Sequence, residues 1–149
     1  MASLAHHYAG RCHCGAVEVE LNLTRPAADF RLRACQCGFC RPRGVRTISD
    51  VAGHATIKAT AGALNPYRFG LKLADYMLCA RCGTYVAAVQ QADDGSVAVV
   101  NVGGLDVPEF RGLPVDPVSY DNETADARLK RRSSYWMPVT IAMTGAAAP

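Results

Sequence analysis

Hydrophobic and polar residues alternate along several short stretches of this chain. Between residues 17 and 23, valine or leucine occupies every second position, and glutamate or asparagine occupies the positions between them. A period of two predicts a β-strand with one buried face and one face in water. Comparable stretches predict strands over residues 16–23, 56–60, 67–69, 76–79, 84–90 and 97–102.

Turn and helix signals are fewer. One helix is expected over residues 123–132, with Asp121 or Asn122 as its N-cap. The sequence Asp-Asp-Gly-Ser at residues 93–96 predicts a hairpin turn between the last two strands. The tail over residues 144–149 is expected to be frayed.

Composition places the chain among globular proteins. Its 149 residues, 50% of them hydrophobic, are enough for one domain with a core of its own. We find no internal repeat, linker or domain boundary, so we expect residues 1–149 to form a single, mainly β domain with at most one or two short helices.

Charge and targeting signals narrow the expected partners. No run approaches the roughly 20 apolar residues that span a bilayer, and the N-terminal residues lack the basic and apolar regions of a secretory signal. We therefore expect a cytoplasmic protein with no membrane partner. A net charge of +3 is too small to indicate a nucleic-acid partner by itself.

Cysteine usage is the unusual feature of this composition. Seven cysteines fall into three groups, and both the odd number and the missing secretory signal argue against a disulfide framework. Grouped thiols are better explained as metal ligands, although buried cysteines that act as small hydrophobic residues are the simpler alternative.

The spacing divides the cysteines into a set of four and a set of three. A structural zinc site is closed by four protein ligands, whereas a catalytic site has three and an open position. Two short motifs that are distant in sequence would form the closed site: Cys12, Cys14, Cys79 and Cys82. Three cysteines within six residues would form the open site, with Gly38 permitting the tight turn: Cys35, Cys37 and Cys40. Alternation along the strand would point Cys12 and Cys14 to the same face.

A redox pair and an iron–sulfur cluster are two alternative uses of these cysteines, and the sequence favours neither. Cys79 and Cys82 have the spacing of a thioredoxin-like redox pair, but such a pair begins a helix, and here a turn and a strand are expected to follow. An iron–sulfur cluster also binds through cysteines, but its usual run of two-residue gaps is absent.

Three motifs together resemble the glutathione-dependent formaldehyde-activating enzyme / centromere protein V family. They are G-x-C-x-C-G-x-V from Gly10, C-x-C-x-x-C-R from Cys35 and C-x-x-C-G-T from Cys79. The resemblance runs to about residues 100–102. It implies a β-tent fold of small sheets joined by a structural zinc at the outer four cysteines. It also implies a catalytic zinc at the middle three, and a carbon–sulfur lyase similar to an S-(hydroxymethyl)glutathione synthase.

Arginines near the cysteines have two interpretations. Three thiolates around Zn²⁺ leave one net negative charge, which Arg41 or Arg43, beside the three-cysteine loop, would offset. Equally, both are ordinary surface arginines in a loop that contains proline and glycine. We predict a catalytic role for Arg41 together with Cys35, Cys37 and Cys40.

The basic segment 128–136 also has two interpretations. It could contact nucleic acid, or it could be a solvated last helical turn, where cations suit the helix dipole, followed by a core Trp136. We favour the second. His13 is expected to be exposed, or to contact a metal-binding cysteine without binding the metal itself. His6, His7 and His54 are assigned no role.

Three functions fit an open three-cysteine zinc site, with two zinc ions expected per chain. The first is addition of a thiol such as glutathione to a small aldehyde, or the reverse. The second is hydrolysis of a small imine- or amide-like substrate by water activated at the metal. The third is a non-catalytic zinc module. We favour the first, with a small molecule as partner; a homodimer is left open.

Overall fold

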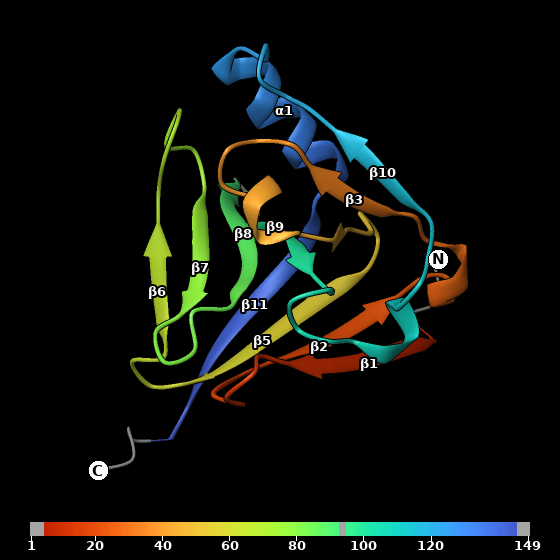
Figure 1. Ribbon diagram of the computed structural model, residues 1–149, viewed down its shortest axis with the longest axis vertical. Helices are drawn as coiled ribbons and strands as arrows, with labels where there is room; N and C mark the ends of the chain where they lie inside the picture. The colour runs from red at the N-terminus through yellow and green to blue at the C-terminus, as the bar shows by residue number, and fades with distance from the viewer. Residues whose placement is uncertain (1–4, 93–94, 146–149) are drawn as a thin grey trace.

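The computed structural model describes residues 5–92 and 95–145, and within them it is built mainly from β-strands (Figure 1). The strands are β1 (His6–Arg11), β2 (Val17–Leu23), β3 (Leu32–Cys35), β4 (Thr47–Ile48), β5 (His54–Thr60), β6 (Leu64–Tyr67), β7 (Asp75–Cys79), β8 (Tyr85–Ala92), β9 (Gly95–Asn101), β10 (Val115–Val118) and β11 (Met137–Thr144). One α-helix, α1 (Ala125–Tyr135), and three short 3₁₀ turns, η1 (Ala27–Asp29), η2 (Arg41–Arg43) and η3 (Pro108–Phe110), complete the described elements. The mainly β fold with one short helix is confirmed.

Hydrogen bonds link the strands into one branched network. Its main path runs β1-β2-β5-β11-β9-β4-β3-β10, and β9 also pairs with β8, which leads on to β7 and β6. Most neighbours are antiparallel, but β11 pairs with β5 and β10 with β3 in parallel. The small sheets that the resemblance implied are therefore continuous with one another. Figure 1 shows β6, β7 and β8 standing on one side of the fold and β1 and β2 lying across its base.

The buried faces agree with the alternation in the sequence. Along β2, the side chains of Val17, Val19, Leu21 and Leu23 are all 0% exposed, while Glu18 and Glu20 face water. These residues belong to the larger of two hydrophobic clusters. The smaller cluster includes Phe39, Tyr85 and Trp136 and packs against the three-cysteine loop.

Five of the six predicted strands are confirmed, with boundaries shifted by one or two residues. The strand expected over residues 67–69 is wrong: the pairing is made by Leu64–Tyr67, which lies opposite Asp75–Cys79. Strands β1, β3, β4, β10 and β11 were not expected. Pro117 in β10 and Pro138 in β11 obscure the pattern, because proline is rarely found inside a strand.

Helix α1 is confirmed, but its predicted cap is wrong. The hydroxyl of Thr124 accepts a hydrogen bond from the backbone N–H of Ala127 at 3.1 Å. Asp121 and Asn122 instead lie in a turn, closed by the N–H of Glu123 donating to the carbonyl of Tyr120 at 3.1 Å. Because of this turn, the helix begins at Ala125, and the Asp121 side chain does not cap it.

Some expectations fall on residues outside the described ranges. The predicted turn at 93–96 lies partly there, since Asp93 and Asp94 are not described, and Gly95 begins β9. The expected frayed tail also lies there from residue 146 onward; residues 137–144 form β11. Within the described residues, no helix is long and apolar enough to cross a membrane.

Candidate metal centres and the adjoining pocket

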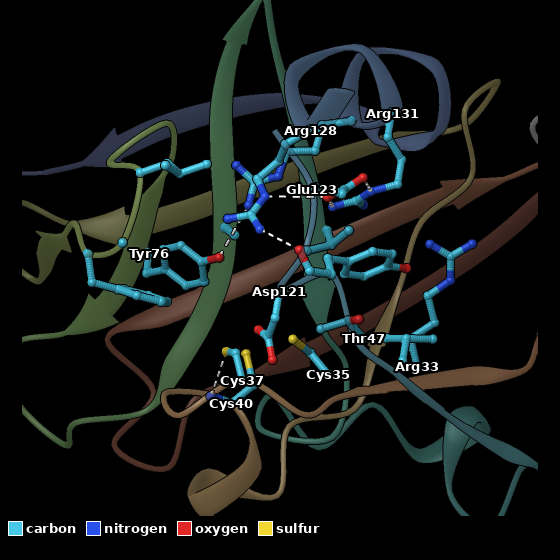
Figure 2. A pocket seen from close by; sticks show the side chains of 18 of the residues that line it. Arg33, Cys35, Cys37, Cys40, Thr47, Tyr76, Asp121, Glu123, Arg128 and Arg131 are labelled. Atoms are coloured by element: carbon cyan, nitrogen blue, oxygen red, sulfur yellow. Dashed lines mark hydrogen bonds and ion pairs between the residues drawn. The ribbon is translucent and has the colours of Figure 1, made fainter. Parts of the chain in front are cut away.

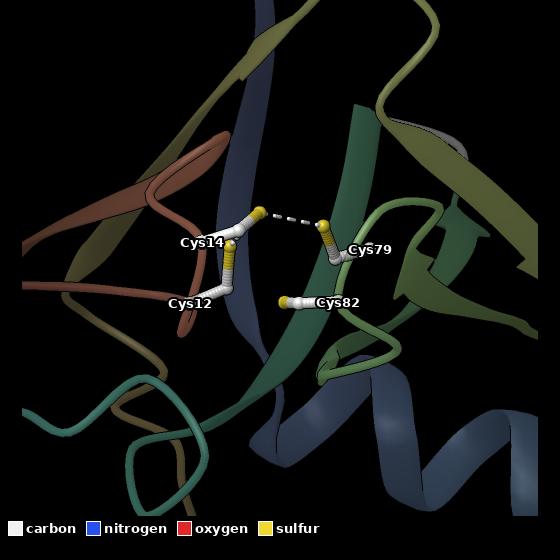
Figure 3. A group of neighbouring side chains, drawn as sticks. All are labelled: Cys12, Cys14, Cys79 and Cys82. Carbon is white, nitrogen blue, oxygen red and sulfur yellow. Dashed lines mark hydrogen bonds between the residues drawn. The ribbon is translucent and has the colours of Figure 1, made fainter.

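The first cysteine cluster joins two turns that are distant in sequence (Figure 3). Cys12 and Cys14 lie in the turn between β1 and β2, and Cys79 and Cys82 lie at the turn between β7 and β8. The Sγ atom of Cys14 is 3.7 Å from that of Cys12 and 3.6 Å from that of Cys79. A tetrahedral ion with metal–sulfur bonds of 2.3 Å needs sulfurs about 3.8 Å apart. The spacing therefore fits one metal ion rather than a cluster of several.

Two similar glycine turns bring these four sulfurs together. The N–H of Gly15 donates to the carbonyl of Cys12 at 3.0 Å, and the N–H of Gly83 donates to that of Cys79 at 2.9 Å. Both glycines have a positive φ, 81° and 80°, which other residues adopt only with strain. The reason we gave for the convergence of Cys12 and Cys14, alternation along a strand, is wrong, because both lie in the turn before β2. His13, between them, is exposed.

The second cysteine cluster is made by one continuous segment. Cys35 ends β3, and Cys37 and Cys40 lie in the loop that leads to η2. Their three sulfurs lie within 4.8 Å of one another. The loop is folded by the N–H of Cys40, which donates to Cys37 Sγ at 3.3 Å, and by the N–H of Arg41, which donates to the Cys37 carbonyl at 3.0 Å.

Phe39 anchors this loop to the fold. Its side chain is 7% exposed and packs against the rings of Tyr67, Phe69, Tyr76 and Tyr85, with centroids 5.1–5.8 Å away. Aromatic pairs at such distances contribute beyond their buried area. The three thiols are thus held in place by packing as well as by backbone hydrogen bonds.

The thiols of each cluster resist ionising together. The Cys40 thiol donates a hydrogen bond that lowers the pKa of Cys35 to about 6, and the same bond and burial raise the pKa of Cys40. In the other cluster, burial raises the pKa of Cys12 to about 12. Burial also opposes ionisation of Cys82, but hydrogen bonds led by that from Thr84 outweigh it and lower its pKa to about 5. A cation is what would allow all the thiols of a cluster to be thiolates at once.

No disulfide joins any of the seven cysteines. The thioredoxin-like interpretation of Cys79 and Cys82 is wrong, because strand β8 follows this pair and both thiols belong to the four-cysteine cluster. Both cysteine groups could therefore hold a metal ion, as expected.

The three-cysteine cluster forms one end of a pocket of about 420 Å³ (Figure 2). Strands β3, β7 and β8, helix α1 and the turn before α1 contribute to its walls. Aromatic side chains, among them Phe69, Tyr76 and Trp136, line it. Burial raises the pKa of Tyr76, so its hydroxyl remains a hydrogen-bond donor. The four-cysteine cluster does not line this pocket.

Asp121 points into the pocket beside the thiols. Figure 2 shows its carboxylate directed toward the sulfurs of Cys35 and Cys37. Its negative charge is one of the influences that oppose ionisation of Cys35. We expected Asp121 only as a helix cap, and no spacing in the sequence connects it with cysteines more than 80 residues before it.

Arginines of α1 form the wall opposite the thiols. Arg128 and Arg131 both pair with Glu123, at 3.4 Å and 2.8 Å, and the Arg131 guanidinium lies 3.6 Å from the ring centroid of Tyr120. Arg132 is 6% exposed and packs 4.6 Å from the ring centroid of Trp136. The interpretation of this segment as a solvated helix end is wrong for these three arginines, whereas the buried Trp136 is confirmed. Their i, i+3, i+4 spacing, which places them on one helix face, was the available signal.

The arginines beside the three-cysteine loop lie differently. Arg41 and Arg43 are exposed, and neither lines the pocket. Arg43 lies 4.0 Å above the Phe39 ring and donates to the Phe39 carbonyl at 2.8 Å. Arg33, on β3, does line the pocket, although no motif in the sequence indicated it.

Comparison with known proteins shows the family of this chain. The sequence model of the family described as "Glutathione-dependent formaldehyde-activating enzyme" matches residues 7–116, well over half of the chain. The chain belongs to this family. The match contains all seven cysteines and the strands that carry them, but it ends before α1, so Asp121 and the helix arginines lie outside the matched residues.

A protein from Rhodobacter sphaeroides of known crystal structure is also similar. It is 33% identical, covers 72% of this chain and 99% of its own, and superposes with a TM-score of 0.55. The identity and coverage support the family assignment, and the TM-score supports a shared fold.

Proposed function

We propose that the chain is a zinc-dependent carbon–sulfur lyase that adds a thiol, such as glutathione, to a small aldehyde, or runs the reverse reaction. The observation that carries this proposal is the position of the three-cysteine cluster. Its three sulfurs would hold a metal ion at the end of a pocket of about 420 Å³, where a substrate in the pocket would reach that ion. Family membership supports this reaction class.

We assign one zinc to each cysteine cluster. Cys12, Cys14, Cys79 and Cys82 would form the closed structural site, and Cys35, Cys37 and Cys40 the catalytic site. Thiolate-rich tetrahedral sites favour zinc among common divalent ions. Zinc at the catalytic site would supply a positive charge that lowers the pKa of an incoming thiol.

The remaining steps belong to residues of this chain. The sulfur forms a bond to the carbonyl carbon while the C=O π pair moves to the oxygen, which takes a proton. The thiol proton passes to the Asp121 carboxylate, which is beside Cys35 and Cys37, and then to that oxygen. The sum is thiol plus aldehyde giving an S-hydroxyalkyl adduct, with no oxidant or reductant. Phe69, Tyr76 and Trp136 keep bulk water away from the reacting atoms.

The test is catalysed exchange between thiol, aldehyde and adduct. We expect zinc-loaded protein to accelerate equilibration of glutathione and formaldehyde, measured by NMR exchange spectroscopy with ¹³C-formaldehyde, over the uncatalysed reaction. Small thiols and aldehydes should be screened in parallel. Hydrolysis of an imine- or amide-like panel, with no acceleration of any thiol–aldehyde pair, would establish the hydrolase alternative instead. Inactivity in both panels combined with salt-dependent DNA binding would favour the non-catalytic module.

A further inference from the structure

Arg132 is a buried cation with no acidic partner among the described residues. Its side chain lines the pocket and is 94% buried, being 6% exposed. The contacts of its guanidinium are long: Nη1 donates to Gln90 Oε1 and Nη2 to Tyr76 Oη, both at 3.5 Å. Its Nε atom has no hydrogen-bond partner at all among the described residues.

The two neighbouring arginines on the same helix do have an acidic partner. Arg128 and Arg131 share Glu123 as an ion-pair partner, and Arg128 also donates to the Tyr120 carbonyl at 2.6 Å. No carboxylate within 4.0 Å pairs with Arg132 in the part of the chain that the structure describes. The three arginines and Glu123 together leave two net positive charges on this wall.

Burying an unpaired guanidinium is costly, so a folded protein retains one where something pairs with it. Burial lowers the pKa of Arg132, which is the direction that an unpaired cation shows. Arginine nevertheless stays protonated in proteins, so an anion rather than proton loss must satisfy the group. Because Arg132 lines the pocket, an anion bound there can reach it.

We propose that Arg132 binds the carboxylate of the substrate, so that the thiol substrate is a carboxylic acid. The acid end would pair with the part of the Arg132 guanidinium that lines the pocket, with the Tyr76 hydroxyl as a second donor. The sulfur would lie at the three cysteines. The placement of the sulfur rests on the proposed function above. A planar carboxylate matches the guanidinium edge with two parallel hydrogen bonds. Arg128 and Arg131 already pair with Glu123, so Arg132 offers a single unpaired cation, which suits a monoanion such as a carboxylate better than a dianion such as phosphate.

Two thiols that differ only at the far end test this proposal. Calorimetry on the zinc-loaded protein compares 3-mercaptopropionate with 3-mercapto-1-propanol. The acid should bind about tenfold or more tightly, since hydrogen bonds to a charged group are stronger than those between neutral groups. Mercaptoacetate and 4-mercaptobutyrate then show which chain length spans the two ends. Equal affinities for the acid and the alcohol would overturn the proposal and leave the proposed function standing.

Variants of α1 test whether Arg132 causes the preference for the acid over the alcohol. Arg132→Gln should abolish the preference for the acid, and Arg132→Lys should restore only part of it, because a lysine lacks the planar fork. Lys130→Gln is the control: it removes a cation from an exposed position of the same helix and should leave the preference unchanged. An Arg132→Gln protein that stays folded and keeps the full preference would contradict the assignment. Should that variant fail to fold, the Lys variant and the wild-type comparison still decide.

A thiol-free acid separates the two proposals. If neither thiol binds, the proposed function fails, and ¹³C-carboxyl butyrate is then titrated and followed by NMR. A chemical-shift change with wild type and with Lys130→Gln, weakened with Arg132→Lys and absent with Arg132→Gln, would uphold the carboxylate site independently. No change with wild type would remove it.

Discussion

The two cysteine clusters use the same ligand atom in opposite structural settings. The four-cysteine cluster connects turns 65 residues apart in sequence, and two of its thiols, Cys12 and Cys79, are 1% and 2% exposed. The three-cysteine cluster lies within one six-residue segment and faces a pocket. The first cluster therefore joins distant parts of the fold, while the second is accessible to a ligand in the pocket.

The position of a metal site in the fold decides whether the metal contributes mainly to folding stability or mainly to activity. A metal that joins distant turns contributes its binding energy to folding, because the unfolded chain cannot form the site. A metal held by one short loop constrains little of the chain, and Phe39 already anchors that loop by packing. Loss of the first site should be felt in the free energy of unfolding, and loss of the second in activity.

Cys79→Ser should have the largest effect on the protein. Structural zinc contributes on the order of 10 kcal/mol to the folding of small zinc peptides, and we expect a smaller but severe loss here, seen as insoluble protein or a much lower melting temperature. Ala80→Ser, in the same turn and exposed, is the matched control and should be near neutral. A benign Cys79→Ser with an unfolded Cys37→Ser would reverse the assignment of the two sites.

Cys37→Ser should leave a folded chain that has lost activity. The variant removes one of three ligands, so metal analysis should show one equivalent less than wild type while the melting temperature falls by only a few degrees. Thiol–aldehyde exchange should drop to the uncatalysed rate. Full activity in this variant would exclude the three-cysteine cluster as the reacting site.

A chelator should distinguish the two clusters without mutation. We expect two zinc equivalents in freshly purified protein, with the equivalent at the pocket removed first, since only three protein ligands hold it. Activity should be lost with this first equivalent and the fold with the second, measured by metal analysis alongside circular dichroism. A maximum of one equivalent, with all seven thiols freely titratable, would disprove the two-site assignment.

Asp121→Asn should reduce turnover while leaving both metals in place. A positioned proton carrier contributes about 10²–10⁴-fold, so we expect kcat to fall by about 10²-fold with little change in thiol affinity. Asn122→Ala changes the neighbouring exposed residue and serves as the control. Unchanged kcat in Asp121→Asn would move the proton step to another group.

Arg41→Ala should have the smallest effect. An exposed charge beside the loop is screened by water and salt, so we expect thiol affinity to fall only about two- to threefold and the difference to vanish at high salt. The buried Arg132 should be far less sensitive to salt. A tenfold or larger loss in Arg41→Ala that persists at high salt would place this arginine at the substrate.

Local patterns predicted the parts of the fold that depend on neighbours in sequence. Alternation identified β2 because its buried face is continuous from Val17 to Leu23. It missed β10 and β11, where proline interrupts the pattern and the parallel partners, β3 and β5, are distant. Short or interrupted strands are specified by what they pair with, which periodicity does not reveal.

The sequence by itself determined the two groups of cysteines that could hold metal ions, because thiols grouped at metal-binding spacing have few other uses and the combined motifs are specific. Only the tertiary structure decided what faces the open cluster. Asp121 and Arg132 line the same pocket as the three cysteines, from a turn and a helix that follow β10, and no local spacing connects them with the cysteines. The basic helix segment was misinterpreted for the same reason: whether a charged face meets water or a pocket depends on what packs opposite it, and that is a property of the folded chain.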